Sequence, residues 1–207
     1  MILVGRYRSP FVRRIAATMK IYGMTYERRV LSTITDGDAI RAVNPVGRVP
    51  ALILDSGETL IDSAAILDHL DECAGPARAL VPEKGAERRE VLKLVALAIG
   101  AVEKAVALAY ELQRRPEHLV FPEWAGKLKG QARAGLAALD GILGPDREWL
   151  ALGRLTQADV SLVSTWDFLG NMLAGTFAET DFPRLAALAE RANRLPAFAE
   201  THPKLDS

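Results

Sequence analysis

The first third of the chain combines two hydrophobic patterns. Strand-like segments, bounded by turn residues or charges, are expected at residues 2–4, 26–31, 50–54 and 59–61. Apolar positions with helical spacing indicate helices at residues 10–22, 38–43 and 62–72. The resulting order, β-α-β-α-β-β-α, predicts a small α/β sheet domain over residues 1–76.

From about residue 87 onward the hydrophobic pattern has only the helical period. Helices are expected at residues 87–114 and 123–143 and, in shorter form, after Thr156, Asp181 and Pro196. Residues 77–86 contain proline and charged side chains and are expected to form a linker. The second part of the chain, residues 87–207, is therefore predicted to be an all-α domain.

The 207 residues have the composition of an ordinary globular protein, with 49% apolar and 25% charged side chains. Twenty-six basic side chains balance twenty-six acidic ones, so no net field favours nucleic acid or an anionic membrane, and we expect neither as a partner. Within this balance, residues 1–30 carry seven basic side chains and one acidic one. We expect a solvated face there, with the border of a pocket for an anionic ligand as the alternative.

Cysteine and histidine are too few and too dispersed to predict a metal site. Cys73 is the single cysteine, which excludes an intramolecular disulfide, and the three histidines are far apart in the sequence. The most apolar stretch, residues 94–102, is much shorter than the roughly 20 residues of a membrane span. The N-terminus lacks the apolar segment of a secretory signal. We therefore expect a cytoplasmic protein without a metal.

Ser9 and Pro10 precede the first expected helix in the order that caps a helix N-terminus. Local structure alone explains both residues. The same position also favours an anion, because the free N–H groups of the first turn carry partial positive charge and a serine hydroxyl donates a hydrogen bond. A thiolate bound beside Ser9 would therefore have a lowered pKa. A nucleophilic role for the serine is not expected, since no supporting His–Asp pair lies nearby in the sequence.

Two further positions combine a structural explanation with a possible binding role. Asp62 precedes an expected helix, where an aspartate is an ordinary N-cap. The same carboxylate could take an ammonium group, while the free N–H groups that begin with Ser63 could hold a carboxylate. Val49 and Pro50 open a strand, and proline is confined to strand starts and edges. The X-Pro bond is also the kind that adopts the cis form, and the sequence leaves the isomer open.

Taken together, these segments resemble a known family. They are GRYRSPFVRR at residues 5–14, NPVGRVPAL at 44–52 and ETLIDSAAILDHL at 58–70, and they are similar in order and separation to the thioredoxin-like half of cytosolic glutathione S-transferases, nearest to serine-type bacterial members. A fourth segment, GRLTQADV at residues 153–160, resembles the N-capping box of the family's helical domain. The resemblance covers essentially the whole chain. It implies a thioredoxin-like domain followed by a C-terminal helical bundle.

The resemblance also implies a glutathione site, position by position. Ser9 would donate a hydrogen bond to the glutathione sulfur and favour its thiolate. Val49 would pair its backbone N–H and C=O with the cysteinyl unit. Asp62 and Ser63 would bind the γ-glutamyl end, and Arg48 would reach toward the peptide. The family further implies a homodimer with glutathione as co-substrate and no metal.

The sequence gives the least information about the pocket for the electrophile. Family analogy points to five candidate wall residues, which are Tyr7, Phe11, Tyr110, Arg114 and Trp166. Aromatic side chains at helical spacing are more often part of a core than of a substrate wall. Both interpretations stay open for each candidate.

Two departures from the family pattern, and one contrast with the wider thioredoxin-like fold, affect the expected reaction. Most members of the family have glutamate at the position of Asp62. Because the aspartate side chain is shorter, its contact with the γ-glutamyl end is expected to be longer or water-mediated. The isomerase branch, which converts maleylacetoacetate, carries a Ser/Cys-Trp-Arg signature that residues 9–14 do not match, and the sequence disfavours it. Residues 9–12 contain no cysteine, so cysteine-dependent thiol exchange at this position is excluded. Cys73 is expected to be a small packing residue.

These observations predict a glutathione transferase that stabilises the glutathione thiolate through Ser9 and adds it to a small electrophile, as in detoxification. One alternative is a non-catalytic protein-interaction module with the same fold, because a fold does not fix a function. Another is a glutathione-dependent peroxidase or dehalogenase, which would share every named residue and differ only in the electrophile pocket.

Overall fold

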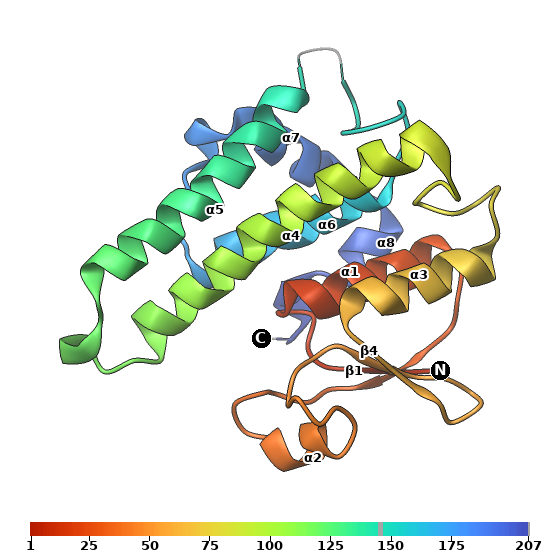
Figure 1. Cartoon of the computed structure of the whole chain (residues 1–207), viewed down its shortest axis with the longest axis horizontal. Coiled ribbons are helices and arrows are strands. Elements are labelled where there is room, and N and C mark those ends of the chain that lie inside the picture. The colour runs from red at the N-terminus through yellow and green to blue at the C-terminus, as the bar shows by residue number, and fades with distance from the viewer. Residues whose placement is uncertain (145–146, 207) are drawn as a thin grey trace. The chain divides into compact units, whose positions relative to one another are not determined.

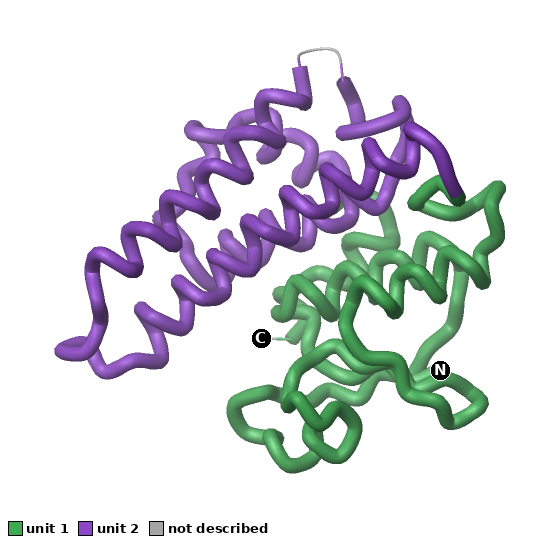
Figure 2. The backbone as a smooth tube through the Cα atoms, viewed as in Figure 1, with its two compact units in different colours: residues 1–83, 193–207 green, residues 84–192 purple. Residues whose placement is uncertain are grey.

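A computed structural model describes residues 1–144 and 147–206 of the chain and divides it into two compact units. Unit 1 consists of Met1–Glu83 together with Asn193–Ser207, and unit 2 consists of Lys84–Ala192 (Figure 2). The sequence predicts that residues 87–207 form the all-α domain. In the structure, the segment that begins at Asn193 packs with unit 1 instead.

Unit 1 contains a four-stranded mixed sheet in the order β2-β1-β3-β4. Strand β1 (Ile2–Val4) pairs in parallel with β2 (Glu27–Arg29) and antiparallel with β3 (Ala51–Ile53), which forms a hairpin with β4 (Thr59–Ile61). The expected order of strands and helices is confirmed. Strand β2 is shorter than the six residues expected, and its exposed, charged ends are typical of an edge strand.

Three helices complete the thioredoxin-like part of unit 1. Helices α1 (Pro10–Ile21) and α3 (Ser63–Ala74) pack against each other on one side of the sheet, and α2 (Gly37–Arg41) lies on the other side (Figure 1). The core is made of side chains that α1, α3 and the central strands contribute, which are Leu3, Val4, Val12, Ile15, Met19, Leu52, Ile66 and Leu70. This packing fixes the N-terminal ends of α1 and α3, where the candidate site residues stand.

Arg13 explains why the C-terminal segment belongs to unit 1. Its side chain is completely buried, its Nε donates to the carbonyl of Thr201 at 3.0 Å, and its Nη2 donates to Oδ1 of Asn193 at 2.8 Å. These bonds hold the segment that contains α8 (Pro196–Ala199) against α1. The expectation of a solvated basic face is therefore wrong for Arg13, and it is also wrong for Arg14, which is 3% exposed.

Unit 2 is all-helical, as expected. Its helices are α4 (Gly85–Gln113), α5 (Pro122–Ile142), α6 (Gln157–Met172) and α7 (Pro183–Ala192), with short 3-10 turns at Glu117–Leu119 and Glu179–Asp181. Helix α4 packs along α5 and α6. The buried apolar side chains come from all four helices and include Val91, Leu94, Val102, Leu128, Leu136, Leu139, Leu162, Val163, Leu185 and Leu188.

The predicted capping box at the start of α6 is present. One carboxylate oxygen of Asp159 accepts from the backbone N–H and the hydroxyl of Thr156 at 2.8 and 2.9 Å, and the other accepts from the N–H of Leu150 at 2.8 Å. Both Thr156 and Asp159 are completely buried. The box therefore ties the preceding loop to the first turn of α6 as well as capping the helix.

Candidate functional site

Ser9 is the N-cap of α1, and Pro10 is the first helical residue. The Ser9 hydroxyl accepts a long hydrogen bond of 3.4 Å from the N–H of Val12 and is partly exposed. Among the described residues the hydroxyl proton has no acceptor. Because the N-terminus of a helix favours negative charge, this free proton and the helix dipole both favour an anion beside Ser9.

Gly5 lets the first turn of α1 and the Val49 segment approach each other. Its φ of +124° is unfavourable for other residues, and a Cβ atom there would lie 2.6 Å from Cγ2 of Val12 and 3.0 Å from Cβ of Val49. The peptide bond between Val49 and Pro50 is cis. Within the described chain, neither the N–H nor the C=O of Val49 has a hydrogen-bond partner. Val49 therefore presents a free donor and a free acceptor close to the turn that carries Ser9.

The loop before Val49 is held by Asn44. Its side-chain amide donates to the carbonyl of Arg48 at 2.9 Å, and its Oδ1 accepts from the N–H of Val46 at 3.0 Å. Asn44 is buried, whereas the Arg48 side chain is exposed. The loop backbone is thus fixed from inside, and the Arg48 guanidinium is free to reach a ligand on the outside.

Asp62 begins α3 in an unusual backbone conformation, with φ of +64° and ψ of 136°. A non-glycine residue at such angles costs of the order of 1–3 kcal/mol, and such strain is concentrated at functional sites. The exposed Asp62 carboxylate accepts from the N–H of Ala64 at 2.9 Å. Next to it, the hydroxyl and the N–H of Ser63 lack a partner in the described part of the chain. The pair offers an acceptor and two donors side by side.

The guanidinium of Arg14 in α1 and the carboxylate of Asp62 at the start of α3 attract each other. Arg14 is almost completely buried. Burial lowers the pKa of the Arg14 guanidinium from 12.5 to about 10, and the attraction of Asp62 opposes this shift. Its Nε has no hydrogen-bond partner among the residues described. Arg14 thus places a poorly solvated cation behind the first turn of α3.

The five candidate wall residues are divided between the two units. Tyr7 is 3% exposed and its hydroxyl lies 2.8 Å from that of Tyr26, while Phe11 is half-buried at the start of α1. Tyr110 and Arg114 are exposed at the C-terminal end of α4. Trp166 packs edge-on against Phe182, with ring centroids 6.1 Å apart, which favours a packing role. The substrate-wall role of each residue stays a prediction.

Sequence reasoning missed Gly5, Asn44 and Arg14 as parts of the site. A glycine or an asparagine in a loop has many explanations, and only the structure gives Gly5 its close neighbours. Arg14 was one of seven basic side chains in residues 1–30 for which a pocket border was only the alternative, because a charged residue in a helix is normally solvent-exposed.

Comparison with known proteins assigns the family. Residues 3–78 match the family model for the N-terminal domain of glutathione S-transferase, and residues 109–191 match the model for its C-terminal domain. The maleylacetoacetate isomerase of Pseudomonas aeruginosa is 34% identical to this chain, over 98% of the chain and 96% of the relative. The chain belongs to the glutathione S-transferase superfamily.

Solved structures agree with this assignment. A glutathione S-transferase from Methylobacillus flagellatus KT with glutathione bound has a TM-score of 0.90 at 26% identity, covering 98% of both chains. A glutathione transferase family member from Pseudomonas fluorescens Pf-5, also with bound glutathione, has a TM-score of 0.86 at 28% identity, again over 98% of both. The expected enzyme class and the thioredoxin-like fold with a helical C-terminal domain are confirmed.

The isomerase branch is represented among the relatives of this chain. The sequence disfavours the isomerase branch, because residues 9–14 lack its signature. However, the maleylacetoacetate isomerase of Pseudomonas aeruginosa matches 98% of this chain. Identity along the whole chain carries more weight than a mismatch in one loop. The mismatch therefore does not exclude this branch.

Residues 1–144 and 147–206 contain neither a candidate membrane-spanning helix nor a candidate metal-binding cluster. Within these ranges no helix is long and apolar enough to cross a membrane. The same residues contain no group of three or more His, Cys, Asp or Glu side chains that could hold a metal ion.

Proposed function

We propose that the protein transfers glutathione to a small electrophile and that Ser9 stabilises the glutathione thiolate. The observation that carries this proposal is the free hydroxyl proton of Ser9 at the N-terminus of α1, beside the unpaired backbone groups of Val49. Solved relatives with 26% and 28% identity hold glutathione, which supports the same ligand here.

The free groups around Ser9 match the chemistry of the tripeptide. The unpaired N–H and C=O of Val49 suit the cysteinyl amide, which has one donor and one acceptor in the same arrangement. The γ-glutamyl end is a zwitterion, so its ammonium suits the exposed carboxylate of Asp62 and its carboxylate suits the donors of Ser63. The exposed guanidinium of Arg48, the residue before Val49, adds a cation that can reach the peptide.

The proposed reaction needs no nucleophile from the protein. The bound thiol loses its proton to solvent, and the Ser9 hydroxyl then donates to the sulfur anion. The thiolate forms a carbon–sulfur bond with the electrophile while the leaving group departs with its electron pair. With an activated double bond, the new carbanion takes a proton from water instead. The protein contributes binding, orientation and electrostatic stabilisation.

Glutathione turnover with a panel of electrophiles tests this proposal. In Ser9→Ala we expect glutathione affinity to change by less than a few-fold, while the transfer rate falls by about tenfold or more, because one stabilising hydrogen bond to the anion is lost. Ser56→Ala is the matched control, since Ser56 is exposed in the turn between β3 and β4. Absence of glutathione binding by the wild type would contradict the proposal and favour the interaction-module alternative.

Isomerisation of a conjugated double bond is the second candidate reaction, and the similarity to a maleylacetoacetate isomerase favours it. The same thiolate would add to the double bond, the resulting single bond would rotate, and elimination would release the thiol. Glutathione is consumed in transfer and regenerated in isomerisation. Turnover of maleylacetoacetate without loss of free thiol would therefore identify the second reaction.

The expected homodimer stays a prediction that rests on the family, and the expected cytoplasmic location stays a prediction that rests on the sequence features described above. Light scattering coupled to size-exclusion chromatography measures the first directly. A mass near 22.5 kDa, that of one chain, would contradict the dimer.

A further inference from the structure

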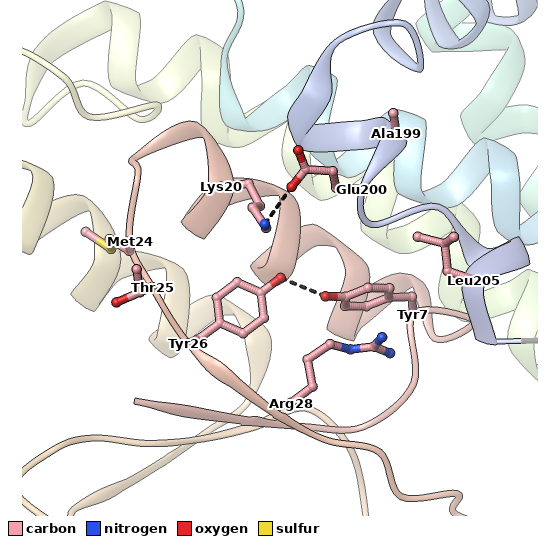
Figure 3. A pocket seen from close by; sticks show the side chains of 9 residues that line it. All are labelled: Tyr7, Lys20, Met24, Thr25, Tyr26, Arg28, Ala199, Glu200 and Leu205. Carbon is pink, nitrogen blue, oxygen red and sulfur yellow. Dashed lines mark hydrogen bonds and ion pairs between the residues drawn. The ribbon is translucent and has the colours of Figure 1, made fainter.

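A cavity of about 760 Å³ lies within unit 1, apart from the candidate glutathione site. It is bounded by the loop before α1, the C-terminal part of α1, the segment leading into β2, and the C-terminal segment of the chain (Figure 3). Its volume lies in the range of pockets that hold small organic ligands. Ser9, Val49, Asp62 and Ser63 do not line it.

Two tyrosine hydroxyls meet in this cavity. The hydroxyl oxygens of Tyr7 and Tyr26 are 2.8 Å apart, so one hydroxyl donates to the other (Figure 3). The accepting hydroxyl keeps its own proton, for which the described residues provide no acceptor. Burial and the bond to Tyr7 raise the pKa of Tyr26, so this phenol stays protonated at physiological pH. The pair therefore offers one hydrogen-bond donor to a ligand.

Apolar side chains flank the tyrosine pair. Met24 lies on the side of Tyr26, and Leu205 lies on the side of Tyr7 (Figure 3). Leu205 is 57% exposed although it is a large apolar residue. An aromatic ring of a ligand that lay between these two side chains and the two phenol rings would bury apolar surface of the ligand and of the protein.

The charged groups of the lining have surplus donors. Lys20 donates to Glu200 at 2.6 Å, and both side chains are largely exposed at 39% and 54%. Arg28 lies over the Tyr7 ring, with its guanidinium carbon 3.6 Å from the ring centroid. Arg28 also pairs with the carboxylate of Asp206, so each cation of the lining already has one carboxylate partner. The ammonium of Lys20 still has further N–H groups to donate. The carboxylate of a ligand can accept from these N–H groups.

We propose that this cavity is a second ligand site, which binds a small aromatic monocarboxylate. The ring lies between Met24 and Leu205 against the tyrosines, and the carboxylate accepts from Lys20 and from the free tyrosine hydroxyl. Tyr7 is also a candidate wall residue of the electrophile pocket, but this site shares no residue with the proposed glutathione contacts, so ligand binding here does not depend on the proposed transfer reaction.

Calorimetric titration with 2-naphthoate tests the site, using the full chain alone and the chain saturated with glutathione. We expect one bound 2-naphthoate per chain under both conditions. Lys20→Met should weaken binding by about tenfold, because it removes a hydrogen bond to the carboxylate of the ligand. Tyr26→Phe should also weaken binding, because it breaks the tyrosine pair that orients the remaining hydroxyl proton. Arg29→Met is the control, since it removes an exposed cation from β2, next to the lining residue Arg28, and Arg29 does not itself line the cavity. The uncharged analogue 2-naphthylmethanol should also bind about tenfold more weakly.

Three results would overturn the proposal. They are the absence of 2-naphthoate binding at millimolar concentration, binding that Lys20→Met leaves unchanged, and displacement of 2-naphthoate by glutathione. Lys20 is exposed, so its substitution does not threaten folding and the test holds even if Tyr26→Phe is unstable.

Discussion

The carboxylate of Asp206, at the C-terminal end of the described chain, accepts a hydrogen bond from the backbone N–H of Tyr7. The same carboxylate pairs with the guanidinium of Arg28 and is only 4% exposed. Tyr7 precedes Ser9 by two residues, and Arg13 binds the C-terminal segment on the other side of Ser9. The end of the chain therefore holds both flanks of the loop that carries the proposed thiolate-stabilising serine.

Replacing Asp206 should loosen this loop. In Asp206→Ala, the N–H of Tyr7 and the guanidinium of Arg28 both lose a largely buried partner. We expect the free energy of unfolding to fall by about 1–3 kcal/mol and kcat for glutathione transfer to fall more than KM rises. Denaturant unfolding and steady-state kinetics measure these effects. Lys204→Ala is the control because Lys204 is exposed in the same segment, and equal behaviour of the two variants would contradict a positioning role.

Arg13→Met should release the C-terminal segment. The variant leaves the buried carbonyls of Thr201 and Phe198 without their charged donor. We expect a loss of about 2–3 kcal/mol in unfolding free energy and faster amide exchange across residues 193–206. Arg89→Met, which changes an exposed arginine of α4, should have little effect. Unchanged exchange in the C-terminal segment would show that Arg13 does not hold it.

Local sequence signals predicted the parts of the fold that neighbouring residues determine. Ser9-Pro10 starts α1, and Thr156 with Asp159 caps α6. Each of these depends on residues a few positions apart, so the pattern contains the necessary information.

Contacts between distant segments were not predictable in this way. Arg13 meets its partners about 180 positions later, and an arginine beside a second arginine in a helix is ordinarily placed in solvent. The pairing of Tyr7 with Tyr26 depends on the path of the loop before α1 and the segment leading into β2. Residue types and their spacing do not predict which distant segments come into contact. The cavity beside Tyr7 and Tyr26 was therefore visible only in the structure.

Gly5→Ala should damage both stability and glutathione binding. The new methyl group would overlap Val12 and crowd Val49, and neither is the end of a flexible side chain. We expect a loss of about 2–4 kcal/mol in unfolding free energy and weaker glutathione binding. Gly23→Ala separates the causes, because Gly23 also has positive φ but open space around it. It should cost only about 1 kcal/mol, and an equal cost in both variants would refute the close-packing argument.

Asp159 should contribute a pH dependence to stability. Burial raises the pKa of the Asp159 carboxyl above its ordinary 3.8, although hydrogen bonds from Leu150 and Thr156 oppose the shift. The folded state then takes up this proton at a higher pH than the unfolded state does. Between the raised pKa and 3.8, acidification therefore favours the folded state through this group.

The variant Asp159→Asn removes that titration and part of the capping box. We expect it to cost about 1–3 kcal/mol at neutral pH, because an amide NH₂ would face the donors of Thr156 or Leu150. The difference in unfolding free energy from the wild type should grow as the pH falls toward 3.8. Denaturant titrations over this pH interval provide the measurement, and a difference that shrinks on acidification would show that the pKa is lowered instead.

The most direct test of the central claim is the pKa of the glutathione thiol bound to the wild type and to Ser9→Ala. Ultraviolet absorbance of the thiolate, recorded against pH at saturating glutathione, gives both values. We expect the bound thiol to ionise below the pKa of free glutathione in the wild type and to shift upward by about one unit in Ser9→Ala, which corresponds to about 1.4 kcal/mol. The same bound-thiol pKa in both proteins, with equal turnover, would contradict the assigned role of Ser9.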